Sequence, residues 1–377
     1  MKNLTRRKFT STLGKGLVAS TLISPAYAVF GSTERKEKKL GVALVGLGSY
    51  STYQLAPALL DTKHCYLAGI VTGTKEKEAI WKNKYALAED CIYNYENFDQ
   101  IINNPKIAIV YVVLPNSMHA NFCIRAAKAG KHVICEKPMA MNVAECDAIM
   151  KACTDNSVKL SVGYRMQSDP HTQELKRYVS ENIFGAVNFV SSDAGYISRG
   201  NPDQWRLNKA LSGGGALMNM GVYSIQTSIY GTGSNPTSVT AQEFSTRPDY
   251  FKDTDETITA QFEFPNGAVG HMMTSHNVNG NRLKVACEKG WIELDPAHSY
   301  GPISGRTSGG KEIKFPHQSQ MALQMDDFSK HILLGTKNLV PGEMGKRDLI
   351  IVEAIYKSIK ENGKKQLLDL GTMGIVT

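Results

Sequence analysis

The stretch Leu40–Ser51, LGVALVGLGSYS, constrains the fold of this chain more than any other. Its apolar run Val42–Val45 predicts a buried strand, which a glycine turn ends before a helical pattern begins. A strand, a glycine turn and a helix in this order are typical of a dinucleotide-binding βαβ unit. In such a unit Gly46 permits the tight turn and Gly48 lets the backbone approach a pyrophosphate. Ser51 replaces the third glycine and is still small, but the pattern alone is a weak signal.

The chain from residue 40 to about 160 repeats the alternation of short apolar runs and helical stretches. The pattern predicts strands at 42–45, 66–71, 109–114, 132–135 and 159–162, and helices at 50–61, 75–87, 118–129 and 142–155. Such alternation indicates a doubly wound parallel sheet, so we expect an α/β Rossmann domain over residues 40–163.

After residue 163 the pattern changes to one of period two. The runs fall at 186–190, 239–242, 257–262, 269–272, 282–285 and 291–294, and helices are predicted at 170–181, 318–334 and 346–362. A hairpin turn is predicted at Pro265–Gly267. These features predict an α+β domain over residues 164–377, with a large, open-faced, mainly antiparallel sheet. Its final helices can pack back on the Rossmann domain.

The N-terminus accounts for most of the net charge of +8. Residues 1–28 hold five basic residues and no acidic one, which leaves 38 basic against 35 acidic residues in the rest of the chain. Because this part of the chain has little excess positive charge, its composition gives no reason to expect a nucleic-acid partner. Thr5–Phe9 is a twin-arginine pattern, followed by an apolar stretch and a small-residue site at Ala26–Ala28. The alternatives are a basic tail or a membrane anchor, although the apolar stretch is too short to span a bilayer.

We therefore predict a twin-arginine signal peptide over residues 1–28, a charged linker over 29–39, and export of the folded protein to the periplasm. No membrane association is expected once the signal is removed. The seven cysteines form no C-x-x-C pair, and several lie in apolar runs, so buried free thiols are expected. Free thiols in an exported protein are consistent with folding before export.

The end of the second predicted strand should select the cofactor. An NAD site places Asp or Glu there, about 20 residues beyond the glycines. Here the segment Thr72–Lys77 places hydroxyls and lysines at the strand end. Those groups suit a 2′-phosphate, so NADP is favoured over NAD. The alternative is that Lys75 and Lys77 only begin a solvated helix.

Two further segments follow the third and fourth strands, where ligands bind in such sheets. They are Leu114–His119, LPNSMH, and Cys135–Pro138, CEKP. The proline fixes the chain after Lys137 and directs this side chain toward the cleft. An ammonium there would polarise a hydroxyl or lower the pKa of a neighbour.

The last group of candidates is the segment Gln204–Tyr223, in which glycines open a helix. Asn219 and Tyr223 are four residues apart and share a helix face. If that face meets the cleft, Tyr223 can exchange a proton with a sugar hydroxyl while Lys137 favours its phenolate. The alternative is that Tyr223 is a core residue.

The motifs GLGSY, LPNSMHA, AGKHVICEKPMA, GYR and QWRLNKALSGGGALMNMGVY, in this order and spacing, resemble the glucose-fructose oxidoreductase branch of the Gfo/Idh/MocA oxidoreductase superfamily. The resemblance runs from about residue 40 to the C-terminal helices. It implies a Rossmann domain joined to an open-faced sheet, with tightly held NADP and no metal. It also implies small-molecule sugars as substrates, and a homo-oligomer, a dimer or tetramer through the open sheet face.

By motif position, the resemblance assigns Lys137 and Tyr223 as the catalytic pair, Thr72 and Lys77 to the 2′-phosphate, and Arg165 and Trp205 to the cofactor and sugar pocket. All candidate site residues together fall into three groups. The catalytic group is Lys137, Tyr223 and Asn219. The cofactor-binding group is Gly46, Leu47, Gly48, Ser49, Tyr50, Thr72, Lys77, Tyr95, Leu114, Pro115, Asn116, His119, Glu136, Lys137, Arg165, Trp205 and Arg206. The substrate group is Lys137, Tyr164, Arg165 and Tyr223.

This chain departs from the family pattern at two places. Asn219 stands where the family has Asp, which removes a carboxylate from the proton-handling face, and the N-terminal arm is short. The leading hypothesis is an exported, NADP-dependent sugar oxidoreductase that oxidises an aldose at C1 and passes the hydride to a second sugar. The alternatives are an ordinary NAD(P)-dependent sugar, inositol or glycoside dehydrogenase with exchangeable cofactor, and a sugar-binding module without catalysis.

Overall fold

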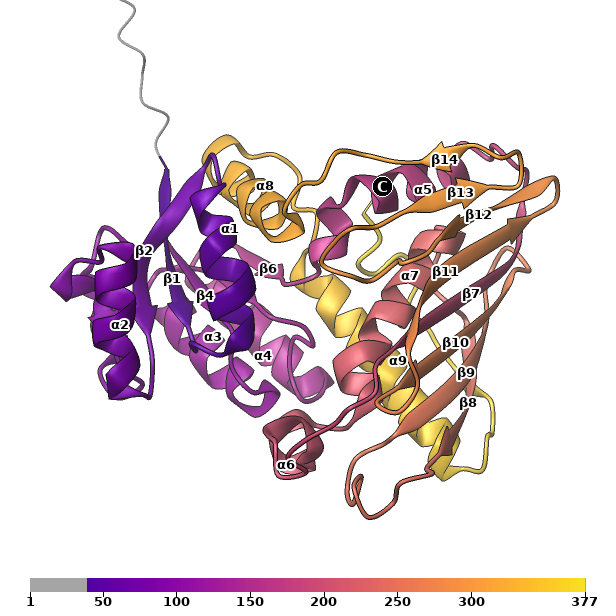
Figure 1. The fold of residues 1–377 in the computed structure, drawn as a ribbon, viewed down its shortest axis with the longest axis horizontal. Helices are drawn as coiled ribbons and strands as arrows, with labels where there is room; N and C mark the ends of the chain where they lie inside the picture. The colour runs from indigo at the N-terminus through magenta and orange to yellow at the C-terminus, as the bar shows by residue number, and fades with distance from the viewer. Residues whose placement is uncertain (1–38, 377) are drawn as a thin grey trace, which may run out of the picture. The chain divides into compact units, whose positions relative to one another are not determined.

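The structure is a computed structural model that describes residues 39–376. The predicted signal peptide and all but the last residue of the predicted linker lie outside the described residues. The part that is described contains two sheets, one in each half of the chain (Figure 1).

The first sheet has six parallel strands in the order β3-β2-β1-β4-β5-β6, which confirms the predicted Rossmann domain. The strands are β1 Leu40–Val45, β2 Cys65–Val71, β3 Ile92–Tyr93, β4 Ile109–Val112, β5 His132–Cys135 and β6 Leu160–Val162. Strand β3 was not predicted, because two residues give no periodic signal. The strand order reverses between β1 and β4, which is where ligands bind in sheets of this kind.

Helices cover both faces of this sheet. They are α1 Ala56–Leu60, α2 Lys75–Tyr85, α3 His119–Lys128 and α4 Val143–Asp155. Successive residues of the buried strands point to opposite faces: Leu44 belongs to the core cluster on one side and Val45 to the cluster on the other. The chain between β1 and α1 winds as a π-helical turn, Ser51–Leu55.

The second sheet has nine strands in the order β14-β13-β12-β11-β7-β10-β9-β8-β15. They are β7 Val187–Gly195, β8 Ser238–Phe244, β9 Thr257–Glu263, β10 Val269–Ser275, β11 Gly280–Cys287, β12 Gly290–Leu294, β13 Gly305–Thr307, β14 Glu312–Ile313 and β15 Gln366–Leu367. Its neighbouring strands are antiparallel except for β7 and β10, which run parallel. The predicted mainly antiparallel sheet is therefore confirmed.

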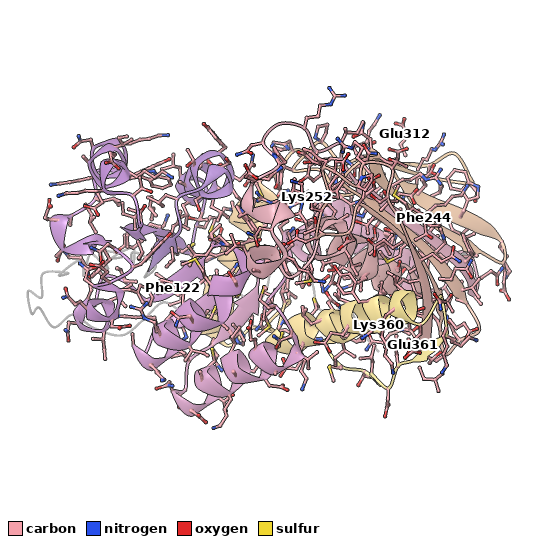
Figure 2. All side chains as sticks on the ribbon, turned by 90° about the horizontal axis from the view of Figure 1, so that it is seen from below. Phe122, Phe244, Lys252, Glu312, Lys360 and Glu361 are labelled. Atoms are coloured by element: carbon pink, nitrogen blue, oxygen red, sulfur yellow. The ribbon has the colours of Figure 1, made fainter. Side chains whose placement is uncertain are left out.

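Helices α7 and α9 run along one face of the second sheet, and the opposite face is open (Figure 1). The helices of this half are α5 Pro170–Ser180, α6 Lys209–Ser212, α7 Val222–Thr232, α8 Gln320–Leu334 and α9 Gly342–Lys360. In Figure 2, Lys360 marks the end of α9 and Phe244 the end of β8, whereas the buried Phe122 lies on α3 in the first domain.

Helix α8 belongs to the second half of the chain but packs on the first sheet. Met325 and Phe328 are buried in the same core cluster as Leu44. The Asp326 carboxylate accepts hydrogen bonds from the backbone N–H groups of Lys63 and His64. The two halves therefore share a core rather than meeting only at a linker.

The seven cysteines are free, and all except the half-buried Cys287 are buried. Among residues 39–376 no helix combines the length and the apolar character needed to cross a bilayer.

Candidate active site

A cavity of about 740 Å³ opens at the carboxyl ends of the first sheet's strands and reaches α7 and the second sheet. This volume suits a small-molecule or cofactor site. The predicted site residues that line it are Gly46, Leu47, Gly48, Ser49, Tyr50, Thr72, Lys77, Tyr95, Leu114, Pro115, Asn116, Glu136, Lys137, Arg165, Trp205, Arg206, Asn219 and Tyr223. The fold thus brings Gly46 and Tyr223, which are 177 positions apart in sequence, to the same cavity.

Two predicted residues lie outside this cavity. His119 is buried, and its two ring nitrogens contact the backbone oxygens of Pro138 and Leu114, so it ties together the two loops that follow β4 and β5. Tyr164 is also buried, where Asp348 raises the pKa of its phenol in addition to the larger effect of burial. The structure thus places both side chains in the framework around the cavity rather than on its lining, and their contacts with cofactor or substrate stay predictions.

The glycine turn after β1 fits a dinucleotide. Gly46 has φ +91°, and a Cβ there would lie 2.4 Å from the Val113 carbonyl oxygen, so only glycine fits. A Cβ on Gly48 would meet no atom within 4 Å, because that position faces open space. Open space beside a glycine and a following helical turn is what a pyrophosphate needs.

The end of β2 carries no carboxylate. Thr72, Thr74 and Lys77 line the cavity there. The Lys77 ammonium donates to the Leu47 carbonyl 2.8 Å away, which holds this charge across the end of the sheet. Lys75 is exposed and does not line the cavity, so the two lysines differ in position.

Lys137 is the cation of the cavity that lies beside Tyr223. Its ammonium donates to the backbone carbonyl of Asn219 at 2.7 Å and lies 4.5 Å from the centre of the Tyr223 ring. Burial lowers the pKa of Lys137 to about 7, although the neighbouring Glu136 opposes the shift. Glu136 in turn accepts a hydrogen bond from Tyr111 at 2.6 Å. An amine that titrates near neutrality is suited to proton handling.

Tyr223 has a second cation beside its ring, because the Arg165 guanidinium carbon lies 5.2 Å from the ring centre. Burial raises the pKa of the Tyr223 phenol, and the Arg165 guanidinium opposes that shift. Arg165 is fixed by backbone oxygens of His298 and Ser299 and by the Gln320 side chain. Arg165 is therefore the cation that lowers the pKa of Tyr223. The prediction gave this role to Lys137 and placed Arg165 only in the cofactor and sugar pocket.

The structure adds residues to the cavity that the sequence reasoning missed. Tyr196 follows β7, and His298 and Tyr300 lie in the loop after β12. The ring centres of Tyr50 and Tyr300 are 5.8 Å apart, and the Arg165 guanidinium carbon lies 4.5 Å from the centre of the Tyr300 ring. No local motif marks these positions, because they reach the cavity only through the pairing of the second sheet.

The fold and the cavity define an oxidoreductase class: a Rossmann sheet whose glycine turn fits a dinucleotide, and a pair formed by the half-buried Lys137 and the buried Tyr223 on the same cavity. Comparison with known proteins agrees. Residues 40–164 match the model of the oxidoreductase family with the NAD-binding Rossmann fold, and residues 172–293 match the GFO/IDH/MocA C-terminal domain. The chain belongs to the Gfo/Idh/MocA oxidoreductase family.

Three similar proteins carry the comparison further. A crystal structure of aldose-aldose oxidoreductase from Caulobacter crescentus is 42% identical, with a TM-score of 0.85 over 88% of this chain and 100% of that one. D-xylose 1-dehydrogenase [NADP(+)] of Haloarcula marismortui is 27% identical over 84% of this chain and 90% of its own length. A levoglucosan dehydrogenase structure with NADH and levoglucosan is 22% identical, with a TM-score of 0.76 over 88% of this chain and 99% of that one, and shares the fold.

Proposed function

We propose that this protein is an NADP-dependent sugar oxidoreductase that oxidises an aldose at C1 to the lactone and delivers the hydride to a second sugar. The observation that carries the proposal is the shared cavity: Tyr223, Lys137 and the nucleotide-binding glycine turn face one space. The similarity to an aldose-aldose oxidoreductase and to an NADP-dependent xylose dehydrogenase supports the choice of sugars.

The proton path runs through Tyr223. An aldose loses its C1 hydrogen as a hydride and its C1 hydroxyl proton to the Tyr223 phenolate, which leaves a lactone. A second sugar then gains the hydride at its carbonyl carbon and the proton from Tyr223 at its carbonyl oxygen. Lys137 and Arg165 stabilise the phenolate that accepts the proton in the first half and is regenerated in the second. The bound nicotinamide cofactor, when present, stores the hydride between them.

NADP is the cofactor that the end of β2 favours. Thr72, Thr74 and Lys77 offer hydroxyls and a cation where an NAD site has a carboxylate. The structure of the related levoglucosan dehydrogenase contains NADH instead. The preference for NADP or NAD is therefore argued from the residues at the end of β2 in this chain and not from the fold.

Export and assembly complete the proposal. The twin-arginine pattern supports export of the folded protein to the periplasm. Two copies can associate through the open face of the second sheet, where Val269 pairs with Phe189, Phe189 with Ala286, and Ala286 with Trp291 in a row across β10, β7, β11 and β12. Phe189 and Val269 on this row are 40% and 45% exposed, which leaves apolar surface for a partner copy to cover.

The experiment that tests the function uses the mature protein. One sample is denatured and its nicotinamide identified, while a second is followed by near-ultraviolet absorbance as glucose and then fructose is added. Bound NADP that glucose reduces and fructose reoxidises would support the proposal. Exchange of the cofactor on dialysis, with steady turnover on added NADP, would instead show an ordinary dehydrogenase. Tight sugar binding with no redox change would show a binding module.

A further inference from the structure

The Asn219 side chain has both of its amide hydrogens engaged. Its Nδ2 donates to the Tyr196 hydroxyl at 3.2 Å and lies 2.9 Å from His276 Nε2. Because an amide nitrogen only donates, His276 Nε2 is the acceptor of the second hydrogen bond. The remaining hydrogen-bonding group of the side chain is Oδ1, which accepts from no residue within 39–376. Asn219 is half-buried and lines the cavity.

His276 is built into the protein behind Asn219. Its exposed fraction is 0%, and it follows β10 without lining the cavity. Its ring packs 4.9 Å from the Tyr196 ring and 6.3 Å from the Phe251 ring, measured between centres. These contacts fix the plane of the imidazole and therefore the direction of Nε2.

His276 is held in its neutral form. Burial lowers its pKa to about 4; Asp255 opposes the shift, whereas Arg206 and Lys137 add to it. A neutral imidazole that accepts at Nε2 carries its hydrogen on Nδ1. That Nδ1 is buried and has no partner among the described residues. A buried polar atom left without a partner is a cost that a packing role alone does not explain.

From this geometry we infer that His276 is a positioning residue that, through the Asn219 amide, directs Asn219 Oδ1 at one hydroxyl of the bound sugar. Asn219 Oδ1 is then a neutral, fixed hydrogen-bond acceptor that favours sugars carrying this hydroxyl over sugars that lack it. A carboxylate at position 219 would behave differently, because it has no hydrogen to donate to His276 Nε2 or Tyr196. Asn219 and His276 thus form a matched pair. The inference rests on the proposed function, since it takes a sugar as the ligand.

The test measures sugar binding rather than turnover. Protein loaded with a redox-inactive NADP analogue, which cannot accept a hydride, is titrated by calorimetry with D-glucose and with its 2-, 3- and 6-deoxy derivatives. The same series is run on D-xylose and its deoxy derivatives. In the wild-type protein we expect one deoxy position to weaken binding about tenfold, the value of one neutral hydrogen bond.

The variants are Asn219→Ala, His276→Leu and His276→Gln. In Asn219→Ala and His276→Leu the parent sugar should bind about tenfold more weakly, and the discriminating deoxy sugar should bind as it does to the wild-type protein. His276→Gln places an amide oxygen near the position of Nε2, so it should restore the discrimination. Thermal melts of each variant report whether the fold is intact.

The outcomes separate the possibilities. Loss of discrimination in His276→Leu with recovery in His276→Gln supports the inference. Equal weakening of every sugar in His276→Leu, which is what a packing defect would cause, overturns it. Unchanged discrimination in His276→Leu overturns it as well. A wild-type protein that binds neither aldose series overturns the proposed function and, with it, this inference.

Discussion

Tyr223 sits where burial and cations act on it in opposite directions. Burial keeps the phenol protonated, while Arg165 favours the phenolate. A group that must accept a proton in one half of a redox cycle and return it in the other needs this balance.

Replacing Tyr223 with Phe should lower kcat by about 10² to 10⁴, because the proton-transfer group is removed while the ring stays. Cofactor content, measured by absorbance of the purified protein, should not change. Tyr230→Phe is the matched control: it lies on the same helix, is buried, and does not line the cavity. A Tyr223→Phe protein with wild-type kcat would show that another group transfers the proton.

Lys137 should set the pH dependence of sugar reduction. Burial lowers its pKa to about 7, so its positive charge is present below pH 7 and is lost as the pH rises through that value. Loss of the charge removes a cation beside Tyr223. The rate of the reductive half-reaction should therefore fall as the pH passes 7, as followed by stopped-flow absorbance. Lys137→Met should be slower and lack this inflection, and an inflection that survives in the variant would assign it to another group.

Lys77 should select the 2′-phosphate of NADP. Removing an ammonium that binds a phosphate costs about tenfold to a hundredfold in affinity. Lys77→Ala should lose affinity for NADP by this factor and keep its affinity for NAD, as measured by equilibrium titration of the cofactor-free protein. Lys75→Ala is the control, because Lys75 is exposed two residues earlier and does not line the cavity. Equal losses in both variants would indicate only a general effect of charge.

At the scale of elements, the carboxylate of Asp255 binds the first backbone N–H groups of the helical segment that carries Asn219 and Tyr223. Asp255 Oδ1 accepts from the Gly215 N–H at 2.6 Å and Oδ2 from the Leu217 N–H at 2.7 Å. A Cβ at Gly215 would lie 2.0 Å from the Asp255 carbonyl oxygen, so glycine is required for this approach.

Asp255→Asn should lower the free energy of unfolding by about 2 kcal/mol, because hydrogen bonds to a charged acceptor are replaced by weaker ones and one acceptor becomes a donor. KM for the sugar should rise as well, since the start of the catalytic segment loosens. Urea unfolding and steady-state kinetics check the two effects. Asp253→Asn should change neither, because Asp253 is exposed and, within residues 39–376, accepts only from the Lys209 N–H.

The sequence predicted elements well where they are long and periodic. Every strand predicted in the Rossmann half has a counterpart, because buried parallel strands are continuous apolar runs between helices. The glycine turn, Lys137 and Tyr223 lie in motifs whose local geometry the residue types dictate, and the structure brings them to one cavity.

What the sequence could not predict depends on tertiary pairing. Tyr196, His276 and Tyr300 come to the site from β7, the end of β10 and the loop after β12, and only the register of the second sheet brings them together. His119 and Tyr164 lie in the motifs that carry the site, but their side chains are buried beside the cavity rather than on its lining, which the sequence does not indicate.

At the scale of the whole molecule, α8 and α9 join the two sheets. Two side chains of α9 accept hydrogen bonds from other elements: the Glu353 carboxylate from the Val143 N–H, and the Ser358 hydroxyl oxygen from the Ala241 N–H. Helix α9 therefore contacts both α4 and β8. Helix α8 completes the core of the first sheet. The cavity lies between parts that these helices hold in place, so its geometry depends on both.

The two halves should therefore unfold as one unit. Phe328→Ala, on α8, should lower the free energy of unfolding by about 3 to 5 kcal/mol, because it leaves a cavity in the shared core. Urea unfolding should be followed in two proteins that keep a single tryptophan, Trp81 in the first half or Trp291 in the second. The two transitions should coincide and shift together on Phe328→Ala, whereas Leu334→Ala, 69% exposed on the same helix, should shift neither. A transition at Trp81 that moves while that at Trp291 stays in place would show that the halves unfold independently, and that α8 stabilises the Rossmann domain alone.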